Sequence, residues 1–301
     1  MEIKGMKIVI AGASGLVGSA LVSKLKAEGA EVTPLVRSAA KSGEIEWHPD
    51  RGSIDAPALE GFDAVINLAG DGIAKGRWTK EKKRRILDSR VNGTRLLSET
   101  IANLSRKPAT FINASAVGFY GSRGDELVDE ESGPGEGFLA GVCRQWESAT
   151  ALAEQAGIRV VKLRLGVILT KDGGIMGSML APFKLGLGGK VGSGEQVISW
   201  VAIDDVVAVI SFILQNESVR GPVNAVAPQP VTNEQFTKTL GSVLSRPTFM
   251  TMPAFAARLA FGEMADEMML SSTRVAGKVL NDAGFKFQFP ELEGAMRAML
   301  G

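Results

Sequence analysis

The chain has 301 residues, 45% of them hydrophobic, which is enough to bury a large core in one large domain or two lobes. Its 34 basic and 33 acidic residues nearly cancel, so its charge does not point to nucleic acid or an anionic membrane surface as a partner. A single cysteine and a single histidine exclude a disulfide framework within the chain and a multi-cysteine or histidine-rich metal site.

The N-terminal part of the chain alternates between short apolar strands and helices. The apolar run 7–11 predicts a buried parallel strand. Over 15–28, apolar residues recur at every fourth position and Gly29 follows, which predicts a helix and its end. Further strands are expected at 32–36, 45–47 and 64–68, followed by a long helix over about 82–104. We interpret the basic run at 80–85 as the solvated start of that helix.

The alternation continues to about residue 169 and then weakens. Strands are expected at 109–115 and 159–165, with a helix over 139–156 between them. The glycine-dense segment 171–199 predicts loops and short elements, and a helix at 204–214 and a last strand at 222–227 follow. From residue 232 the sequence predicts mostly helix.

This order of elements predicts an α/β fold, a Rossmann-type doubly wound parallel sheet with a smaller, mostly helical C-terminal lobe. We expect residues 1–168 and 200–228 to form the nucleotide-binding domain. Residues 169–199 and 229–301 would form the substrate lobe, with a cleft between the two at the carboxyl ends of the strands.

The first strand and helix are joined by Gly12-Ala13-Ser14-Gly15-Leu16-Val17-Gly18. In this context Gly12 permits a tight turn, Gly15 lets the backbone approach a pyrophosphate, and Gly18 lets the helix pack closely on the strand. The start of the helix adds free N–H groups and a positive dipole end. The motif therefore predicts a dinucleotide site in which the cofactor contacts Gly12, Ser14, Gly15, Leu16 and Val17.

The residues after the second strand favour NADP over NAD. NAD sites place an acidic residue there to hold the ribose 2′-hydroxyl, and the segment 36–41 contains none. Arg37 can instead present a planar guanidinium to a 2′-phosphate, and Lys41 would add charge. The alternative is that Arg37 is a solvated loop residue.

These and further motifs resemble the extended short-chain dehydrogenase/reductase superfamily, in its epimerase/dehydratase branch. The matching segments are 12–18, Asn67-Leu68-Ala69-Gly70, Val91-Asn92-Gly93-Thr94, 115–121 and 200–205. Segments 137–147, 188–194, 227–233 and 284–287 resemble more narrowly an atypical "epimerase family" subgroup with an uncharacterised C-terminal module. The resemblance implies an NADP(H)-binding Rossmann fold, with cofactor contacts that include Leu68, Ala69, Gly70, Ser115 and Leu165.

The usual catalytic pair of that superfamily is absent. Its members use Tyr-x-x-x-Lys with a serine or threonine, the lysine lowering the pKa of the tyrosine that acts as acid and base. The single tyrosine here, Tyr120, has Gly124 four residues on. An alignment on the helix with Trp146-Glu147 places Leu139 and Cys143 where the pair should stand. Ala116 takes the place of the serine, and a one-residue shift would put Ser115 there instead. The resemblance implies the fold and the cofactor but not the usual mechanism.

Three residues are the candidates for chemistry. Tyr120 is either a proton donor or a packed aromatic with a satisfied hydroxyl. Cys143 is either a functional thiol or a small buried hydrophobe. Asn92 corresponds to a helix asparagine that the family uses near its active site. The acids of segment 125–131 offer one further acid or base, or only a charged surface loop. His48, after the third strand, lies on the adenine side, where we expect no catalytic role.

Two functions remain open. The first is an NADP(H)-dependent oxidoreductase or epimerase-like enzyme for a small carbonyl or sugar-like substrate, with a non-standard proton donor. The alternative is a non-catalytic NADP(H)-binding regulator or sensor. The glycine, tryptophan and acidic residues around the cleft favour the enzyme, and the missing pair favours the sensor. No signal-peptide core or membrane-length apolar run is present, so we expect the cytoplasm or an organelle matrix and no membrane partner.

Overall fold

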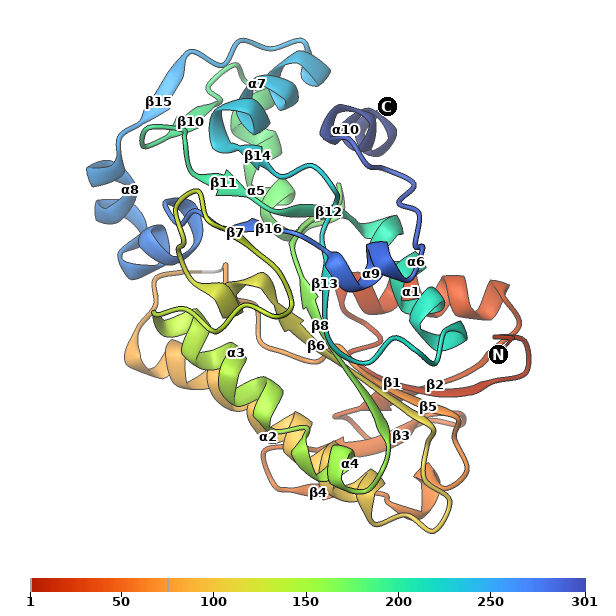
Figure 1. Ribbon diagram of the computed structural model, residues 1–301. Helices are drawn as coiled ribbons and strands as arrows, with labels where there is room; N and C mark the ends of the chain where they lie inside the picture. The colour runs from red at the N-terminus through yellow and green to blue at the C-terminus, as the bar shows by residue number, and fades with distance from the viewer. Residues whose placement is uncertain (1, 75) are drawn as a thin grey trace.

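The computed structural model describes residues 2–74 and 76–301, so positions 1 and 75 of the predicted nucleotide-binding domain lie outside the described residues. An eight-stranded sheet of order β13-β8-β6-β5-β1-β2-β3-β4 runs through the centre (Figure 1). Its strands are β1 (Lys7–Ala11), β2 (Glu31–Val36), β3 (Ile45–His48), β4 (Ser53–Ile54), β5 (Ala64–Asn67), β6 (Thr110–Ala116), β8 (Arg159–Leu165) and β13 (Gly221–Ala225). Neighbouring strands are parallel except β4, which is antiparallel to β3. The predicted doubly wound Rossmann sheet is confirmed.

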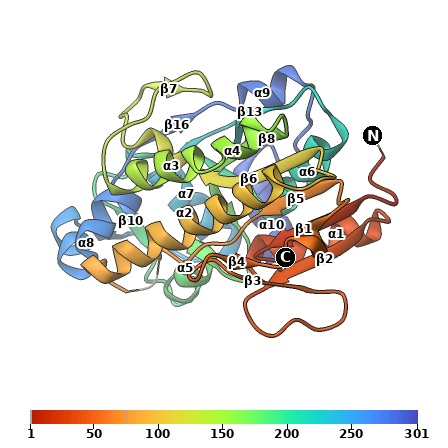
Figure 2. The same ribbon diagram turned by 90° about the horizontal axis from the view of Figure 1, so that it is seen from below.

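Helices cover both faces of this sheet (Figures 1 and 2). One face carries α1 (Leu16–Ala27) and α6 (Ile203–Gln215); the other carries α2 (Lys80–Ala102), α3 (Phe138–Ser148) and α4 (Ala151–Gln155). Ile8 and Ile10 of β1 pack into the core under α1 and α6, whereas Val9 packs into the core under α2. Because both faces are buried, the strand is an unbroken apolar run in the sequence.

The predicted single helix over 139–156 is wrong, because the structure divides it into α3 and α4. Buried Thr150 interrupts the helix, and its Oγ1 donates to the carbonyl of Glu147 at 2.8 Å. The N–H of Ala153 donates to Ser98 Oγ on α2 at 2.9 Å. These hydroxyls bond to the backbone groups at the break, so the chain turns without leaving them unsatisfied.

Most of the remaining elements are short strand pairs and helices that gather beyond the carboxyl ends of the sheet, whereas η1 leads into the amino end of β5 (Figure 1). The strands are β7 (Leu127–Val128), β9 (Val167–Leu169), β10 (Gly189–Val191), β11 (Val197–Ile198), β12 (Trp200–Ala202), β14 (Val231–Thr232), β15 (Met250–Met252) and β16 (Arg274–Val275). The helices are α5 (Gly174–Lys184), α7 (Asn233–Leu244), α8 (Ala254–Phe261), α9 (Lys278–Asp282) and α10 (Leu292–Leu300), with short turns η1 (Pro57–Leu59), η2 (Val117–Tyr120) and η3 (Ala265–Met269). Among the described residues, no helix has both the length and the apolar character that crossing a bilayer requires.

Candidate dinucleotide site

The glycine-rich turn between β1 and α1 brings three backbone segments into close contact. Gly12 has φ +80°, and a Cβ on it would lie 2.8 Å from the carbonyl carbon of Leu68, just after β5. A Cβ on Gly18 would overlap the carbonyl oxygen of Gly12. Only glycine fits at both positions, so the packing roles predicted for these two residues are confirmed.

The N-terminus of α1 is left open. Its N-cap is Gly15, no side chain caps it, and its first turn contains no acidic residue. Ser14 and Gly15 are exposed, and Leu16 and Val17 are half-buried. The first N–H groups and the positive end of the helix dipole therefore remain available to an anion beside the carboxyl end of β1.

A free positive charge stands next to this turn. Arg37 directly follows β2, whose Leu35 is paired with Ala11 at the end of β1, and its side chain is exposed. Among the ion pairs of the described residues, none involves Arg37 or the nearby, exposed Lys41. Arg37, which is predicted to bind a 2′-phosphate, thus has no carboxylate partner among the described residues.

Arg90 is a further candidate residue that the sequence analysis did not identify. It lies half-buried on α2, with its guanidinium carbon 3.2 Å from the position of a Cβ on Gly70. The guanidinium donates to the carbonyl of Asp71 at 3.0 Å and lies over the Trp146 ring at 5.1 Å. Desolvation lowers the pKa of Arg90, and no ion pair within the described part of the chain involves it. A partly buried cation without a carboxylate partner is suited to a ligand anion.

The start of α2 holds the turn that follows β5. Lys82 is buried, and its Nζ donates to Asp71 Oδ2 at 2.8 Å and to the carbonyl of Gly72 at 2.6 Å. This hydrogen bond is the main reason that the pKa of Asp71 is lowered. Lys83 pairs with Glu263 at 2.7 Å. The interpretation of this basic run as a solvated helix start is therefore wrong for Lys82, which fixes the turn at Asp71 and Gly72, and for Lys83, which is half-buried and connects α2 to the C-terminal part of the chain.

Tyr120 lies in a buried polar network that also contains Ser115, Glu147, Arg164 and Asn224. Its hydroxyl donates to Asn224 Oδ1 at 2.8 Å and accepts from Arg164 at 2.8 Å. Arg164 donates twice to the Glu147 carboxylate, at 2.8 Å each, and the Ser115 hydroxyl donates to Glu147 at 2.7 Å. Burial raises the pKa of Tyr120. Both hydroxyls that the sequence placed near the cofactor are thus engaged inside the network.

The other candidates occupy the positions expected from the sequence. Cys143 is buried on α3 one turn after Leu139, and burial raises the pKa of its thiol to about 12, so it is a neutral thiol at neutral pH. Asn92 is half-buried in the middle of α2. Leu165 ends β8 and is paired with Ala116 of β6.

The acidic segment after Tyr120 divides into two kinds of residue. Asp125, Glu126 and Glu131 are exposed. Glu130 is buried, its carboxylate accepts backbone N–H groups of Asn224, Lys278 and Val279, and burial raises its pKa. These bonds connect the segment to the sheet and to the C-terminal part of the chain. His48 hydrogen bonds to Glu46 at 2.8 Å on β3, beyond β2 on the predicted adenine side.

Comparison with known proteins identifies the family. The model of the NAD dependent epimerase/dehydratase family matches residues 8–226, and that of a domain of unknown function (DUF1731) matches residues 252–299. Epimerase family protein Mb2239 of Mycobacterium bovis is 45% identical over 281 residues, 93% of each chain. Human epimerase family protein SDR39U1 is 34% identical over 298 residues, 98% of this chain and all of its own. The chain therefore belongs to the NAD-dependent epimerase/dehydratase family and has an SDR39U1-like organisation.

A solved structure resembles the whole chain. The crystal structure of human SDR39U1 (isoform 2) with NADPH aligns with a TM-score of 0.90 at 33% identity, and the alignment covers 98% of this chain and 99% of that one. The predicted superfamily and subgroup, and the predicted C-terminal module, are confirmed by these matches.

Proposed function

We propose that this member of the epimerase/dehydratase family binds NADP(H) in preference to NAD(H) and is an oxidoreductase or epimerase-like enzyme for a small carbonyl or sugar-like substrate. The observation that carries the proposal is the open N-terminus of α1 beside the unpaired guanidinium of Arg37. The N-terminus of α1 offers the positive end of its dipole to a pyrophosphate, and the planar guanidinium of Arg37 offers two N–H donors to a 2′-phosphate. The relative crystallised with NADPH supports the choice of cofactor.

The residues around the turn fit such a dinucleotide. The backbone from Gly12 to Val17 would hold the pyrophosphate, because the N-terminus of α1 is uncapped and Ser14 and Gly15 are exposed. Arg37 and Lys41 would bind the 2′-phosphate. The strand ends at Leu68, Ala69, Gly70, Ser115 and Leu165 would line the rest of the site, and the Arg90 guanidinium beside Gly70 would neutralise phosphate charge.

The side chains near the predicted nicotinamide position would hold the reactants in place rather than act as acids or bases. A bound nicotinamide supplies or accepts a hydride. Leu139 has no titratable group, and Cys143 stays protonated, so neither serves as a base near neutral pH. The Tyr120 hydroxyl is held by Asn224 and Arg164. We infer that any proton comes from water or from a group of the C-terminal lobe.

The test is a panel of small aldehydes, ketones and nucleotide sugars, monitored by the absorbance of NADPH and by product analysis. Turnover in the wild type, lost in Gly15→Val, supports the enzyme. Tight NADPH binding without turnover of any compound in the panel would contradict the catalytic part of the proposal.

That second outcome would favour the alternative, a non-catalytic NADP(H) sensor. Its specific support is the engagement of the Tyr120 and Ser115 hydroxyls in the buried polar network. A sensor would show a change in hydrogen exchange of the C-terminal part of the chain when NADPH is added, in the absence of any substrate.

A further inference from the structure

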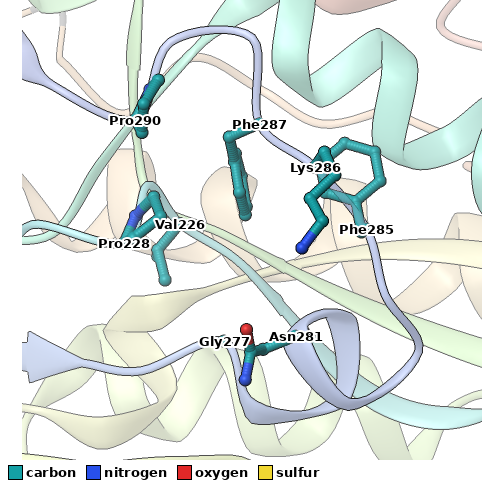
Figure 3. Close-up of a pocket in the computed structure, with 8 residues that line it drawn as sticks. All are labelled: Val226, Pro228, Gly277, Asn281, Phe285, Lys286, Phe287 and Pro290. Atoms are coloured by element: carbon teal, nitrogen blue, oxygen red, sulfur yellow. The ribbon is translucent and has the colours of Figure 1, made fainter.

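A cavity of about 440 Å³ lies beside the end of β13, at one edge of the sheet and away from the glycine-rich turn (Figure 3). It is bordered by the segment that follows β13, by α9 and by the loop 285–290. Three strands, β8, β6 and β5, separate β13 from β1. The volume falls within the range of about 300–1,000 Å³ typical of small-molecule sites.

Two buried carboxylates fix the walls of this cavity. Glu130 accepts the N–H groups of Lys278 and Val279 at 3.1 and 3.3 Å, which anchors α9. Asp205 accepts the N–H groups of Gln288 and Phe289 at 2.7 and 3.0 Å, which anchors the loop. Both walls are therefore tied to the central sheet and to α6, so the cavity is formed before any ligand arrives.

The lining is largely apolar and flat. Val226, Pro228 and Pro290 border one side, and the ring of Phe287 stands across from them (Figure 3). The Phe287 ring is held edge-to-face by Phe285, with ring centroids 4.9 Å apart. Such walls favour a ligand with an apolar, planar body.

Two polar groups face the same space. The amino group of Lys286 points into the opening between Phe287 and Asn281 (Figure 3). Among the described residues, Lys286 belongs to no ion pair, and the side-chain amide of Asn281 makes no hydrogen bond. The nearby Asp282 carboxylate is paired with Lys278 at 2.8 Å. An exposed cation and an exposed amide, both without a protein partner among the described residues, thus stand beside a partly apolar pocket whose lining includes no carboxylate.

We propose that this cavity is a binding site for a small aromatic monocarboxylate, separate from the dinucleotide site. The ring of the ligand packs between Phe287 and the two prolines. Its carboxylate binds the Lys286 ammonium and accepts from the Asn281 amide, in place of water.

The test is calorimetric titration of the full chain, saturated with NADPH, with 2-naphthoate and with its neutral analogue 2-naphthamide. We expect 2-naphthoate to bind the wild type with one site and the amide to bind about five- to tenfold more weakly, because it lacks the charge-assisted bond. Lys286→Gln should weaken 2-naphthoate by a similar factor and leave the amide unchanged. Lys26→Gln, at an exposed position on α1, is the matched control and should change neither.

Phe287→Ala tests the apolar wall and should weaken both compounds about tenfold, because the lost ring burial affects them equally. Its thermal unfolding is measured alongside, and Lys286→Gln carries the test if Phe287→Ala is poorly folded. The proposal is overturned if 2-naphthoate does not bind, if Lys286→Gln and Lys26→Gln bind it equally, or if NADPH displaces it.

Discussion

The glycine-rich turn and the buried polar network lie at the same carboxyl edge of the sheet but differ in how their polar groups are used. At the turn, the N–H groups that open α1 are uncapped and Arg37 has no ion pair in the described chain. In the network, Tyr120, Glu147 and Arg164 are buried and bonded to one another or to their neighbours. Polar groups without a protein partner can bind a ligand, whereas buried polar groups that bond to one another stabilise the fold.

Because of this difference, we expect substitutions in the two regions to affect different properties, cofactor affinity at the turn and folding stability in the network. Changes at the turn should alter cofactor affinity and spare the folded state. Changes at Tyr120, Glu147 or Arg164 of the network should lower the free energy of unfolding and spare cofactor affinity. The superfamily's usual pair is predicted to fall at Leu139 and Cys143, which lie outside this network, so we expect the network to serve the fold.

The largest effect is expected for Arg164→Met in the network. Loss of the guanidinium leaves the Glu147 carboxylate buried with Ser115 as its remaining side-chain partner, which should lower the free energy of unfolding by about 3–5 kcal/mol. Urea denaturation measures this loss. Arg297→Met, which removes an exposed pair with Glu293, is the control and should change little. Equal stability of both variants would show that the network is not what holds this edge together.

Gly15→Val should produce the largest effect on binding. A branched side chain at the open end of α1 would block the backbone from the pyrophosphate, so we expect NADPH affinity to fall at least about a hundredfold. Calorimetry measures the affinity, and thermal unfolding shows whether the variant is folded. Gly294→Ala, in α10 and with open space around it, serves as the control. A folded Gly15→Val protein with wild-type affinity would refute the phosphate-binding role of the turn.

Tyr120→Phe should give a moderate loss of stability. Without the hydroxyl, Asn224 and Arg164 each lose a buried partner, which should cost about 1–3 kcal/mol of unfolding free energy. Affinity for NADPH should not change. If an activity is found and this variant lowers it by about 10²–10⁴-fold while remaining stable, Tyr120 is a proton donor after all.

The smallest effect is expected from the pH dependence of Cys143. Its pKa is raised from 9.0 to about 12 by burial, so the folded state binds the thiol proton more tightly than the unfolded state. This contribution to stability is complete below pH 9.0 and is lost as the pH rises toward 12. Between about pH 8 and about pH 10, the free energy of unfolding of the wild type should therefore fall by about 1.4 kcal/mol more than that of Cys143→Ala. Parallel curves for the two proteins would mean that the thiol ionises freely in the fold.

The sequence predicted the sheet and the glycine-rich turn because their signals are local. An apolar run such as Ile8–Ile10 and the spacing of Gly12 and Gly18 depend on a strand and helix adjacent in the chain. The break at Thr150 escaped prediction because its hydroxyl and that of Ser98, far away in sequence, bond to the freed backbone groups.

The sequence analysis did not identify Arg90 either, because its contacts with Asp71 and Trp146 are distant in the chain. One sequence signal was nevertheless present. Arg90 lies on the same stripe of α2 as the buried Ile86 and Leu97, so a charge stood where an apolar side chain was expected. The buried network joins residues from β6, η2, α3, β8 and β13. Only the folded arrangement shows that these residues meet, because their separations in the chain carry no pattern.

The central claim is that the edge beside β1 and β2 recognises the 2′-phosphate of NADP(H). Calorimetric titration of the wild type, Arg37→Ala and the exposed control Arg84→Ala with NADPH and with NADH tests it most directly. We predict that the wild type and the control bind NADPH about ten- to a hundredfold more tightly than NADH, because a charge-assisted bidentate contact contributes about 1.5–3 kcal/mol. Arg37→Ala should lose most of that preference and keep its affinity for NADH. An unchanged ratio of the two affinities in Arg37→Ala would contradict the account.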